Sequence, residues 1–126
     1  MIDPNNPCLF CDIKKSGCAH ENELAYASYD SYPVSKYHCL VIPKRHIKDY
    51  FDLTNEELLA CNNLIKIVKN EIINKDETVR GFNLGTNIGK VSGQSIHHCH
   101  FHLIPRRKQD VENPQGGVRS VIPGKQ

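Results

Sequence analysis

The longest periodic pattern of apolar residues in the chain predicts one α-helix, from about Thr54 to Asn74. Apolar side chains recur there at steps of three and four residues, which places them on one face of a helix. They are Leu58, Cys61, Ile65, Val68 and Ile72. Thr54 followed by Glu57 matches the capping box that begins many helices, and two acidic residues in the first turn suit the helix dipole. We therefore expect a long helix with one apolar face.

Four shorter runs are apolar or alternating over lengths typical of β-strands. They are Leu24–Tyr29, His38–Ile42, Arg80–Asn87 and Ser95–Ile104. A proline follows the second run and another follows the fourth, and we expect each to end its strand. The order strand, strand, helix, strand, strand predicts an α+β domain with a mainly antiparallel sheet. We expect residues 1–126 to form one domain, in which residues 106–126 are an irregular C-terminal tail.

The overall composition is that of an ordinary globular domain. The 126 residues are 39% hydrophobic and 24% charged, and 16 Lys and Arg against 14 Asp and Glu leave a net charge of +2. Such a balanced charge gives no argument for a nucleic-acid partner, and no apolar run approaches the roughly 18–20 residues of a membrane span. The first residues do not resemble a signal peptide. We therefore expect a cytoplasmic protein with reduced thiols and with neither a membrane nor nucleic acid as a partner.

Three histidines alternate along the predicted strand 95–104. Because successive side chains of a strand point to opposite faces, His98, His100 and His102 share one face, and the apolar residues between them face the core. Adjacent His97 belongs to the other face or to the edge of the strand. An imidazole has a reference pKa of about 6.5, so it can act as a nucleophile or as an acid near neutral pH. A row of three can hold an anion, attack it and protonate a leaving group, and we interpret this face as catalytic.

Glycines recur at every fourth position between the last two predicted strands, at residues 81, 85, 89 and 93. Glycine lets backbone N–H groups approach an anion closely. The spacing excludes a Walker A loop, because Leu84 and Val91 stand where that motif needs Gly and Ser or Thr. Neutral hydrogen-bonding residues accompany the glycines, among them Asn87, Gln94 and Ser95. The segment is therefore a candidate phosphate-binding loop.

Cys8 and Cys11 form a CxxC pair, which alone is compatible with zinc, with redox chemistry or with coincidence. A thioredoxin-like role needs the pair at the start of a helix within a βαβ pattern, and no such pattern is visible. Structural zinc needs two further ligands. The candidates are His46 and one histidine of the predicted strand 95–104.

Residues 98–104 resemble the motif His-φ-His-φ-His-φ-φ of the histidine-triad (HIT) superfamily of nucleotide hydrolases and transferases, where φ is an apolar residue and Cys99 is the only soft match. The similarity covers nearly the whole chain. Its other segments are Cys8–Ile13, Tyr29–Pro33, Leu40–Ile47, Asn83–Ser95 and Asn113–Arg119. The resemblance implies a HIT-like fold, with a five-stranded antiparallel sheet and one long and one short helix, usually assembled as a homodimer.

The resemblance also implies roles for individual residues. His100 would be the nucleophile, His102 would support phosphate binding and leaving-group protonation, and His98 would bind zinc or orient the site. Ser95 would act on the leaving group. The nucleotide would contact Asp30, Asn87, Gln94, Ser95, His100 and His102, with Asp30 accepting hydrogen bonds from the ribose hydroxyls. The ligands of a structural zinc ion would be Cys8, Cys11, His46 and His98, with His97 as the rival for the fourth position.

The function implied by the resemblance is hydrolysis of a purine nucleotide conjugate at its α-phosphate. The substrate would be a diadenosine polyphosphate or an adenosine phosphoramidate, and a covalent nucleotidyl-histidine would release a nucleoside monophosphate. One alternative is a nucleotidyltransferase or phosphorylase of the same superfamily. Those branches typically carry Gln at the third motif position, where this chain has His102. The other alternative is a zinc-bearing protein that binds nucleotides as an adaptor.

Overall fold

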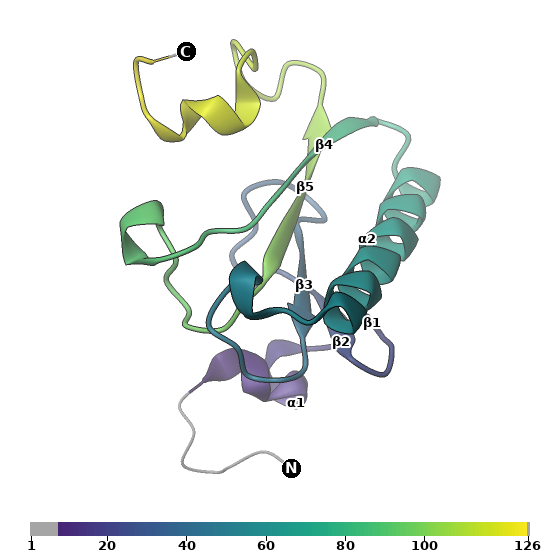
Figure 1. The fold of residues 1–126 in the computed structure, drawn as a ribbon. Helices are drawn as coiled ribbons and strands as arrows, with labels where there is room; N and C mark the ends of the chain where they lie inside the picture. The colour runs from purple at the N-terminus through teal and green to yellow at the C-terminus, as the bar shows by residue number, and fades with distance from the viewer. Residues whose placement is uncertain (1–7, 126) are drawn as a thin grey trace.

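The computed structural model describes residues 8–125, which form a five-stranded antiparallel sheet with one long helix against it (Figure 1). The strands are β1 (His20–Glu21), β2 (Ala25–Tyr29), β3 (Cys39–Pro43), β4 (Val79–Gly85) and β5 (Phe101–Arg107), in the order β1-β2-β3-β5-β4. The helices are α1 (Ile13–Ser16) and α2 (Asn55–Lys75), and 3₁₀ turns lie at Leu9–Cys11, Tyr50–Asp52, Lys90–Ser92 and Gly117–Val121. The predicted fold class is confirmed. No helix in this part of the chain is long and apolar enough to cross a bilayer.

Helix α2 begins with the capping box that the sequence predicts. The Thr54 hydroxyl accepts a hydrogen bond from the Glu57 N–H at 3.1 Å, and a Glu57 carboxylate oxygen accepts one from the Thr54 N–H at 2.9 Å. These bonds satisfy two N–H groups that the start of a helix would otherwise leave unpaired. The helix ends at Lys75, one residue beyond the predicted end.

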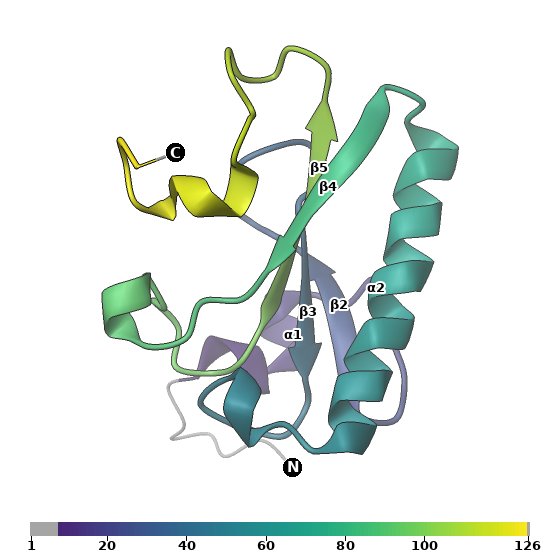
Figure 2. The same ribbon diagram turned by 45° about the horizontal axis from the view of Figure 1, so that its top comes forward.

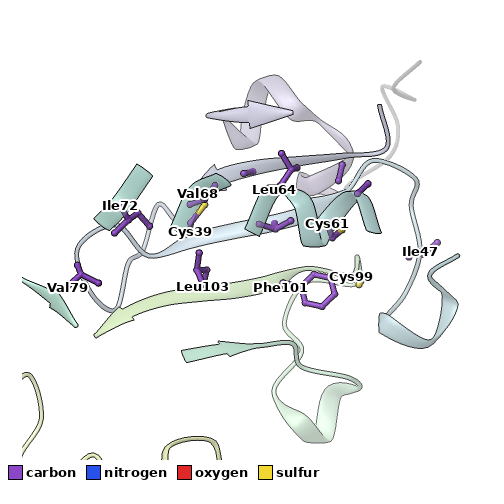
Figure 3. Close-up of a cluster of buried hydrophobic side chains, with 14 residues drawn as sticks. Cys39, Ile47, Cys61, Leu64, Val68, Ile72, Val79, Cys99, Phe101 and Leu103 are labelled. Carbon is purple, nitrogen blue, oxygen red and sulfur yellow. The ribbon is translucent and has the colours of Figure 1, made fainter. Parts of the chain in front are cut away.

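The sheet carries an apolar cluster on each face. On one face, alternate residues of β2, β3 and β5 pack under the buried side of α2 (Figure 3). This cluster includes Val41 and Leu103 from the sheet and Leu64 and Val68 from α2. The smaller cluster on the other face consists of Phe10, Tyr26, Leu40 and Ile42. The N-terminal segment that carries Phe10 therefore covers the face of the sheet opposite α2.

The segment predicted as strand 95–104 differs from its prediction. Strand β5 begins only at Phe101 and continues to Arg107, so residues 95–100 approach it as an irregular loop. The pairing with β3 stops at the contact between Val41 and Phe101, so the chain before Phe101 has no ladder with β3 to extend.

The C-terminal tail is shorter than predicted and contains a helical turn. Arg106 pairs with Gly81 of β4 and Arg107 ends β5, so the irregular segment begins at residue 108 rather than 106. The 3₁₀ turn Gly117–Val121 lies across β4 from α2 (Figure 2). Strand β4, which was expected to reach Asn87, ends at Gly85 and forms one edge of the sheet.

Candidate functional site

The three triad histidines share one side of the segment that leads into β5. His98 and His100 precede the strand, and His102 lies within it. The residues between them belong to the core under α2; these are Cys99, Phe101 and Leu103. The predicted alternation of faces is therefore present, although only the third histidine is part of a regular strand.

His100 is buried, and a hydrogen bond fixes the orientation of its ring. Its Nδ1 donates to the main-chain carbonyl oxygen of His98 at 2.8 Å. A carbonyl oxygen can only accept, so Nδ1 carries the proton and Nε2 carries a lone pair. Burial lowers the pKa of His100 below its usual value of 6.5, which keeps the ring neutral. A neutral imidazole that presents its Nε2 lone pair can act as a nucleophile.

Two further contacts hold His100. The ring of Phe10 meets the imidazole in an edge-to-face arrangement with 4.9 Å between the centroids. The Thr86 hydroxyl donates to the carbonyl oxygen of His100 at 2.7 Å. Side chains from the N-terminal turn and from the loop after β4 thus position the ring and the backbone of this histidine.

His102 receives a hydrogen bond from His38, the residue before β3. The Val34 N–H donates to Nδ1 of His38 at 3.2 Å, so the His38 proton lies on Nε2 and is donated to Nδ1 of His102 at 2.9 Å. The proton of neutral His102 is then on Nε2. Burial, followed by the nearby rings of His100 and His38, lowers the pKa of His102 to about 4. His102 therefore presents an N–H donor beside His100, whose ring centroid is 5.0 Å away.

Four side chains from three segments converge around the ring of His98, whose carbonyl oxygen accepts the hydrogen bond from His100. The Cys8 Sγ lies 3.3 Å from Nδ1 of His98, and the Cys11 Sγ lies 3.5 Å from the same atom. The Cys11 Sγ is also 3.1 Å from Nδ1 of His46. All four candidate ligand atoms lie within 4.8 Å of one another. The structure brings together the expected metal ligands, with His98 in the fourth position, whereas His97 is exposed.

The donor atoms and their spacing fit a zinc ion. Two thiolates and two imidazoles are a common set for structural zinc, whose ligand atoms are about 3.3–3.8 Å apart in a tetrahedron. The sulfur–nitrogen distances of 3.1, 3.3 and 3.5 Å are close to this spacing. Nε2 of His98 donates to the Pro43 carbonyl oxygen at 2.7 Å, which leaves the lone pair on Nδ1, facing the sulfur atoms. The residues present can therefore hold zinc without rearrangement of His98.

A second group of possible metal ligands, Asp30, His38 and His102, does not fit a metal in the same way. Its ligand atoms also lie within 4.8 Å of one another, and a carboxylate oxygen of Asp30 is 3.6 Å from Nε2 of His38. A metal-binding histidine needs a lone pair on the nitrogen that faces the ion. In His38 the Val34 N–H uses the lone pair of Nδ1, which places the proton on Nε2. This group is arranged to pass a hydrogen bond to His102.

Three of the expected nucleotide-binding residues lie at the surface or near it. Asp30 follows β2; one of its oxygens accepts the Tyr32 N–H at 2.9 Å, and the other faces His38. Asn87 and Ser95 are exposed in the loop between β4 and β5. All three are accessible to a ligand, and their contacts with a nucleotide stay a prediction.

Gln94 differs from its expected role as a phosphate contact. It is buried, its Oε1 accepts the Gly89 N–H at 2.9 Å, and its Nε2 donates to the carbonyl oxygens of Lys48 and Ile96 at 2.7 and 3.2 Å. Both amide N–H groups are therefore used within the protein, whereas a phosphate oxygen needs a donor. The backbone of Gly89 has φ of 86°, a conformation that favours glycine. Gln94 thus holds the glycine-rich loop in place beside Ser95.

Four residues that orient the site were not predicted from the sequence. They are Phe10, His38, Pro43 and Thr86. The sequence offers a weak signal for His38, since it is one of only seven histidines. Pro43 acts through its carbonyl oxygen, so its side chain carries no signal at all.

Comparisons with known proteins show which family the chain is similar to. Residues 14–109 match the family model described as the HIT domain. An uncharacterised HIT-like protein of Methanocaldococcus jannaschii is 35% identical over 119 residues, which cover 90% of this chain and 91% of the relative. The adenosine 5'-monophosphoramidase of Schizosaccharomyces pombe is 34% identical over 107 residues, which cover 82% of this chain and 77% of the relative.

Among solved structures, a zinc-bound histidine triad family protein of Mycobacterium smegmatis superposes with a TM-score of 0.74 at 29% identity. The superposition covers 82% of this chain and 78% of that structure.

Proposed function

The chain belongs to the HIT family of nucleotide hydrolases and transferases, and from this premise we propose that it is a nucleotide hydrolase. Its substrate is a purine nucleotide conjugate, a diadenosine polyphosphate or an adenosine phosphoramidate, and its product is a nucleoside monophosphate. One observation carries the proposal: His100 presents a lone pair on Nε2 while neighbouring His102 presents an N–H. A nucleophile and a proton donor side by side are what substitution at phosphorus requires.

In the proposed first step, Nε2 of His100 attacks the α-phosphorus. The phosphorus–nitrogen bond forms as the bond from phosphorus to the leaving group breaks, and the leaving group takes the electron pair. His102 donates from Nε2 to the phosphate or to the departing atom, and Ser95 is the second candidate donor there. The resulting nucleotidyl-imidazolium keeps Nδ1–H bonded to the His98 carbonyl oxygen. An amine leaving group takes up one proton from solvent as it departs. In the second step water attacks phosphorus and loses one proton to solvent, the phosphorus–nitrogen bond breaks, and His100 leaves with its Nε2 lone pair restored.

The activity of one relative supports the choice of leaving group. The protein of Schizosaccharomyces pombe is an adenosine 5'-monophosphoramidase, so it acts on a bond between phosphorus and nitrogen. We propose the same class of substrate for this chain, with Asp30 binding the ribose hydroxyls. A carboxylate accepts from both vicinal hydroxyls; the Tyr32 N–H holds one oxygen of Asp30, and the other oxygen lies 3.6 Å from Nε2 of His38.

We also propose that Cys8, Cys11, His46 and His98 bind one structural zinc ion. The support is the geometry of the four ligand atoms and the zinc-bound relative of Mycobacterium smegmatis. Bound zinc supplies a fixed point for the three segments, and the proposed chemistry is carried by imidazole groups. Elemental analysis should find about one zinc per chain, and replacing Cys8 and Cys11 together by Ser should remove the metal and lower the melting temperature.

The other proposed properties concern assembly and location. Strand β4 is an edge strand with Leu84 48% exposed, and such an edge can pair with a second copy of the chain. We propose a homodimer, for which light scattering should give about twice the 14.3 kDa of one chain. Buried thiols such as Cys61 and Cys99 are consistent with a cytoplasmic protein.

The experiment that tests the function is the replacement of His100 by Ala in a zinc-loaded protein. Hydrolysis of an adenosine phosphoramidate should fall by at least about a thousandfold, since the covalent route is lost, while binding of adenosine monophosphate should persist. The matched control is His97→Ala, which changes an exposed neighbour and should keep the wild-type rate. A rate above about a tenth of wild type in His100→Ala would contradict the assignment. Transfer to an acceptor in preference to water would favour the transferase alternative.

A further inference from the structure

We propose that the Cys–His centre sets the rate of the reaction by holding His100 in place, with His98 and Phe10 as the positioning residues. By the Cys–His centre we mean Cys8, Cys11, His46 and His98. The proposal rests on the proposed function, because it takes His100 as the nucleophile.

The first connection runs through His98. Its ring is held at both nitrogens, since Nδ1 faces the cysteine sulfur atoms and Nε2 donates to the Pro43 carbonyl oxygen at 2.7 Å. A ring fixed in this way restricts the backbone of the same residue. The His98 carbonyl oxygen accepts the Nδ1–H of His100 at 2.8 Å and so determines where Nε2 of His100 points. The metal ligand and the nucleophile are joined by one residue.

The second connection runs through Phe10, which lies between the two cysteines of the CxxC pair. Phe10 is 4% exposed, and its ring packs edge-to-face on the rings of both His98 and His100, with centroid distances of 6.2 and 4.9 Å. Tyr26 donates to the Phe10 carbonyl oxygen at 2.7 Å. Phe10 therefore forms a wall against one side of the nucleophile, and its position depends on where the cysteines on either side are held.

The N-terminal segment has little secondary structure of its own, and apart from the cysteines it is held by the burial of Phe10 against the sheet and by the Tyr26 hydroxyl. The turn Leu9–Cys11 has three residues, and its N-cap, Cys8, makes no side-chain capping hydrogen bond. Helix α1, which follows, has four residues. Helices this short do not persist by themselves. Ligation of a metal by two residues of this segment and by His46 and His98 joins three parts of the chain at one point, and that point lies next to His100.

The expected effect of losing this anchor is on kcat more than on KM. Asp30, the proposed ribose contact, is held by Tyr32 and His38, which lie outside the Cys–His centre. Nucleotide binding should therefore persist, while Nε2 of His100 spends less time aligned with the phosphorus atom. We expect removal of the metal to lower kcat by at least about tenfold and to change KM by less than about threefold.

The first test observes His100 directly, without an activity assay. Protein labelled with ¹⁵N in its histidine rings is compared zinc-loaded and after chelation, well below its melting temperature. The loaded protein should give separate resonances for a protonated Nδ1 and an unprotonated Nε2 of His100, and the metal-free protein should give averaged ones. Circular dichroism checks that the metal-free protein is folded. A folded metal-free protein with unchanged His100 resonances and unchanged kcat would overturn the proposal.

The second test leaves the metal in place, so it holds even if the metal-free chain unfolds. Phe10→Leu keeps an apolar side chain but removes the aromatic edge, and Leu9→Ala changes a neighbour that is 41% exposed on the same turn. With equal zinc content, Phe10→Leu should lower kcat about three- to tenfold and leave KM unchanged. Leu9→Ala should match wild type. Equal kcat in the two variants would show that Phe10 does not position His100.

A failure of the proposed function would be recognised separately. If the zinc-loaded wild-type protein hydrolyses no adenosine phosphoramidate, the function is wrong, and the His100 resonances still decide whether the Cys–His centre holds this ring. If the protein does hydrolyse the substrate, and neither kcat nor the resonances depend on zinc, only the positioning proposal is wrong.

Discussion

Replacing Arg45 by Met should destabilise the protein far more than the same change at the adjacent residue. Arg45 lies between Lys44 and the metal-ligand candidate His46, and its guanidinium donates to both carboxylate oxygens of Glu57 at 2.8 and 2.9 Å. It also donates to the Asp52 carbonyl oxygen at 3.1 Å. One side chain thus connects the segment after β3 to the first turn of α2.

The magnitude follows from the burial of the two partners. The Glu57 side chain is 5% exposed, and the Arg45 side chain is 54% exposed. Arg45→Met leaves the buried Glu57 carboxylate with two hydrogen bonds fewer. A buried acceptor left unsatisfied costs about 1–3 kcal/mol, so we expect a loss near the middle of that range, about 2 kcal/mol. The control Lys44→Met breaks a surface pair with Glu21 and should cost less than about 1 kcal/mol.

The assay is urea unfolding of both variants in saturating zinc, with Glu57→Gln and the double variant completing a cycle. The hydrogen bonds from Arg45 lower the pKa of Glu57 from 4.5 to about 2. A carboxyl group with a depressed pKa stabilises the fold above its unfolded pKa and loses that contribution as pH falls toward the folded pKa. The gap between wild type and Arg45→Met should therefore shrink between pH 4.5 and 3. A gap at pH 7 no larger than that of Lys44→Met would refute the reasoning.

Three other predictions concern the triad and the glycine-rich loop. Burial lowers the pKa of His98, His100 and His102, so kcat/KM should stay high below pH 6.5, and a rate that halves at pH 6.5 or above would contradict a neutral buried nucleophile. In metal-free protein below about pH 6.5, these histidines bind protons in the unfolded chain but stay neutral in the folded protein. The free energy of unfolding should therefore decrease as the pH is lowered below that value, by up to about 1.4 kcal/mol per pH unit for each histidine. Ser95→Ala should slow turnover about ten- to hundredfold, most for substrates with an amine leaving group, and near-equal rates with both substrate classes would exclude Ser95 from the chemistry.

The elements that local patterns specify were predicted well from the sequence. The capping box at Thr54 and the apolar periodicity placed both ends of α2 to within one residue, because a helix makes its hydrogen bonds within itself. Strands β2 and β3 were also predicted to within one residue at each end. The interactions that decide the helix lie within a few residues of one another in the chain, and the two strands are marked by continuous runs of apolar residues.

Strand β5 was misplaced because its ends depend on other strands. Pro105 was expected to end it, yet the carbonyl oxygen of Pro105 accepts from the Ser35 hydroxyl, on the side that faces away from β4. The missing N–H of Pro105 is on that same side. Strand β5 pairs with β3 only from Phe101 to Leu103, so Pro105 lies beyond the end of that pairing and its missing N–H costs no hydrogen bond to β3. A proline is tolerated in a strand where the N–H that another residue would have there needs no partner from a neighbouring strand. The sequence does not show which positions have such a partner.

In the candidate site, too, the sequence predicts which residues are present, and the fold determines their individual roles. The motif does not distinguish the three histidines, but in the structure one ring nitrogen of each is hydrogen-bonded to a different group, which we call its committing group. These groups are the Pro43 carbonyl oxygen for His98, the His98 carbonyl oxygen for His100 and the His38 ring for His102. The committed nitrogen sets the tautomer and hence what the other nitrogen offers: a lone pair to a metal, a lone pair to phosphorus, or a proton. Two of the three committing groups are main-chain carbonyls, which every residue carries. The roles of His98 and His102 therefore follow from contacts with distant segments, and that of His100 follows from a carbonyl oxygen two residues away. Changing a committing group should change what the ring offers without changing a histidine of the triad.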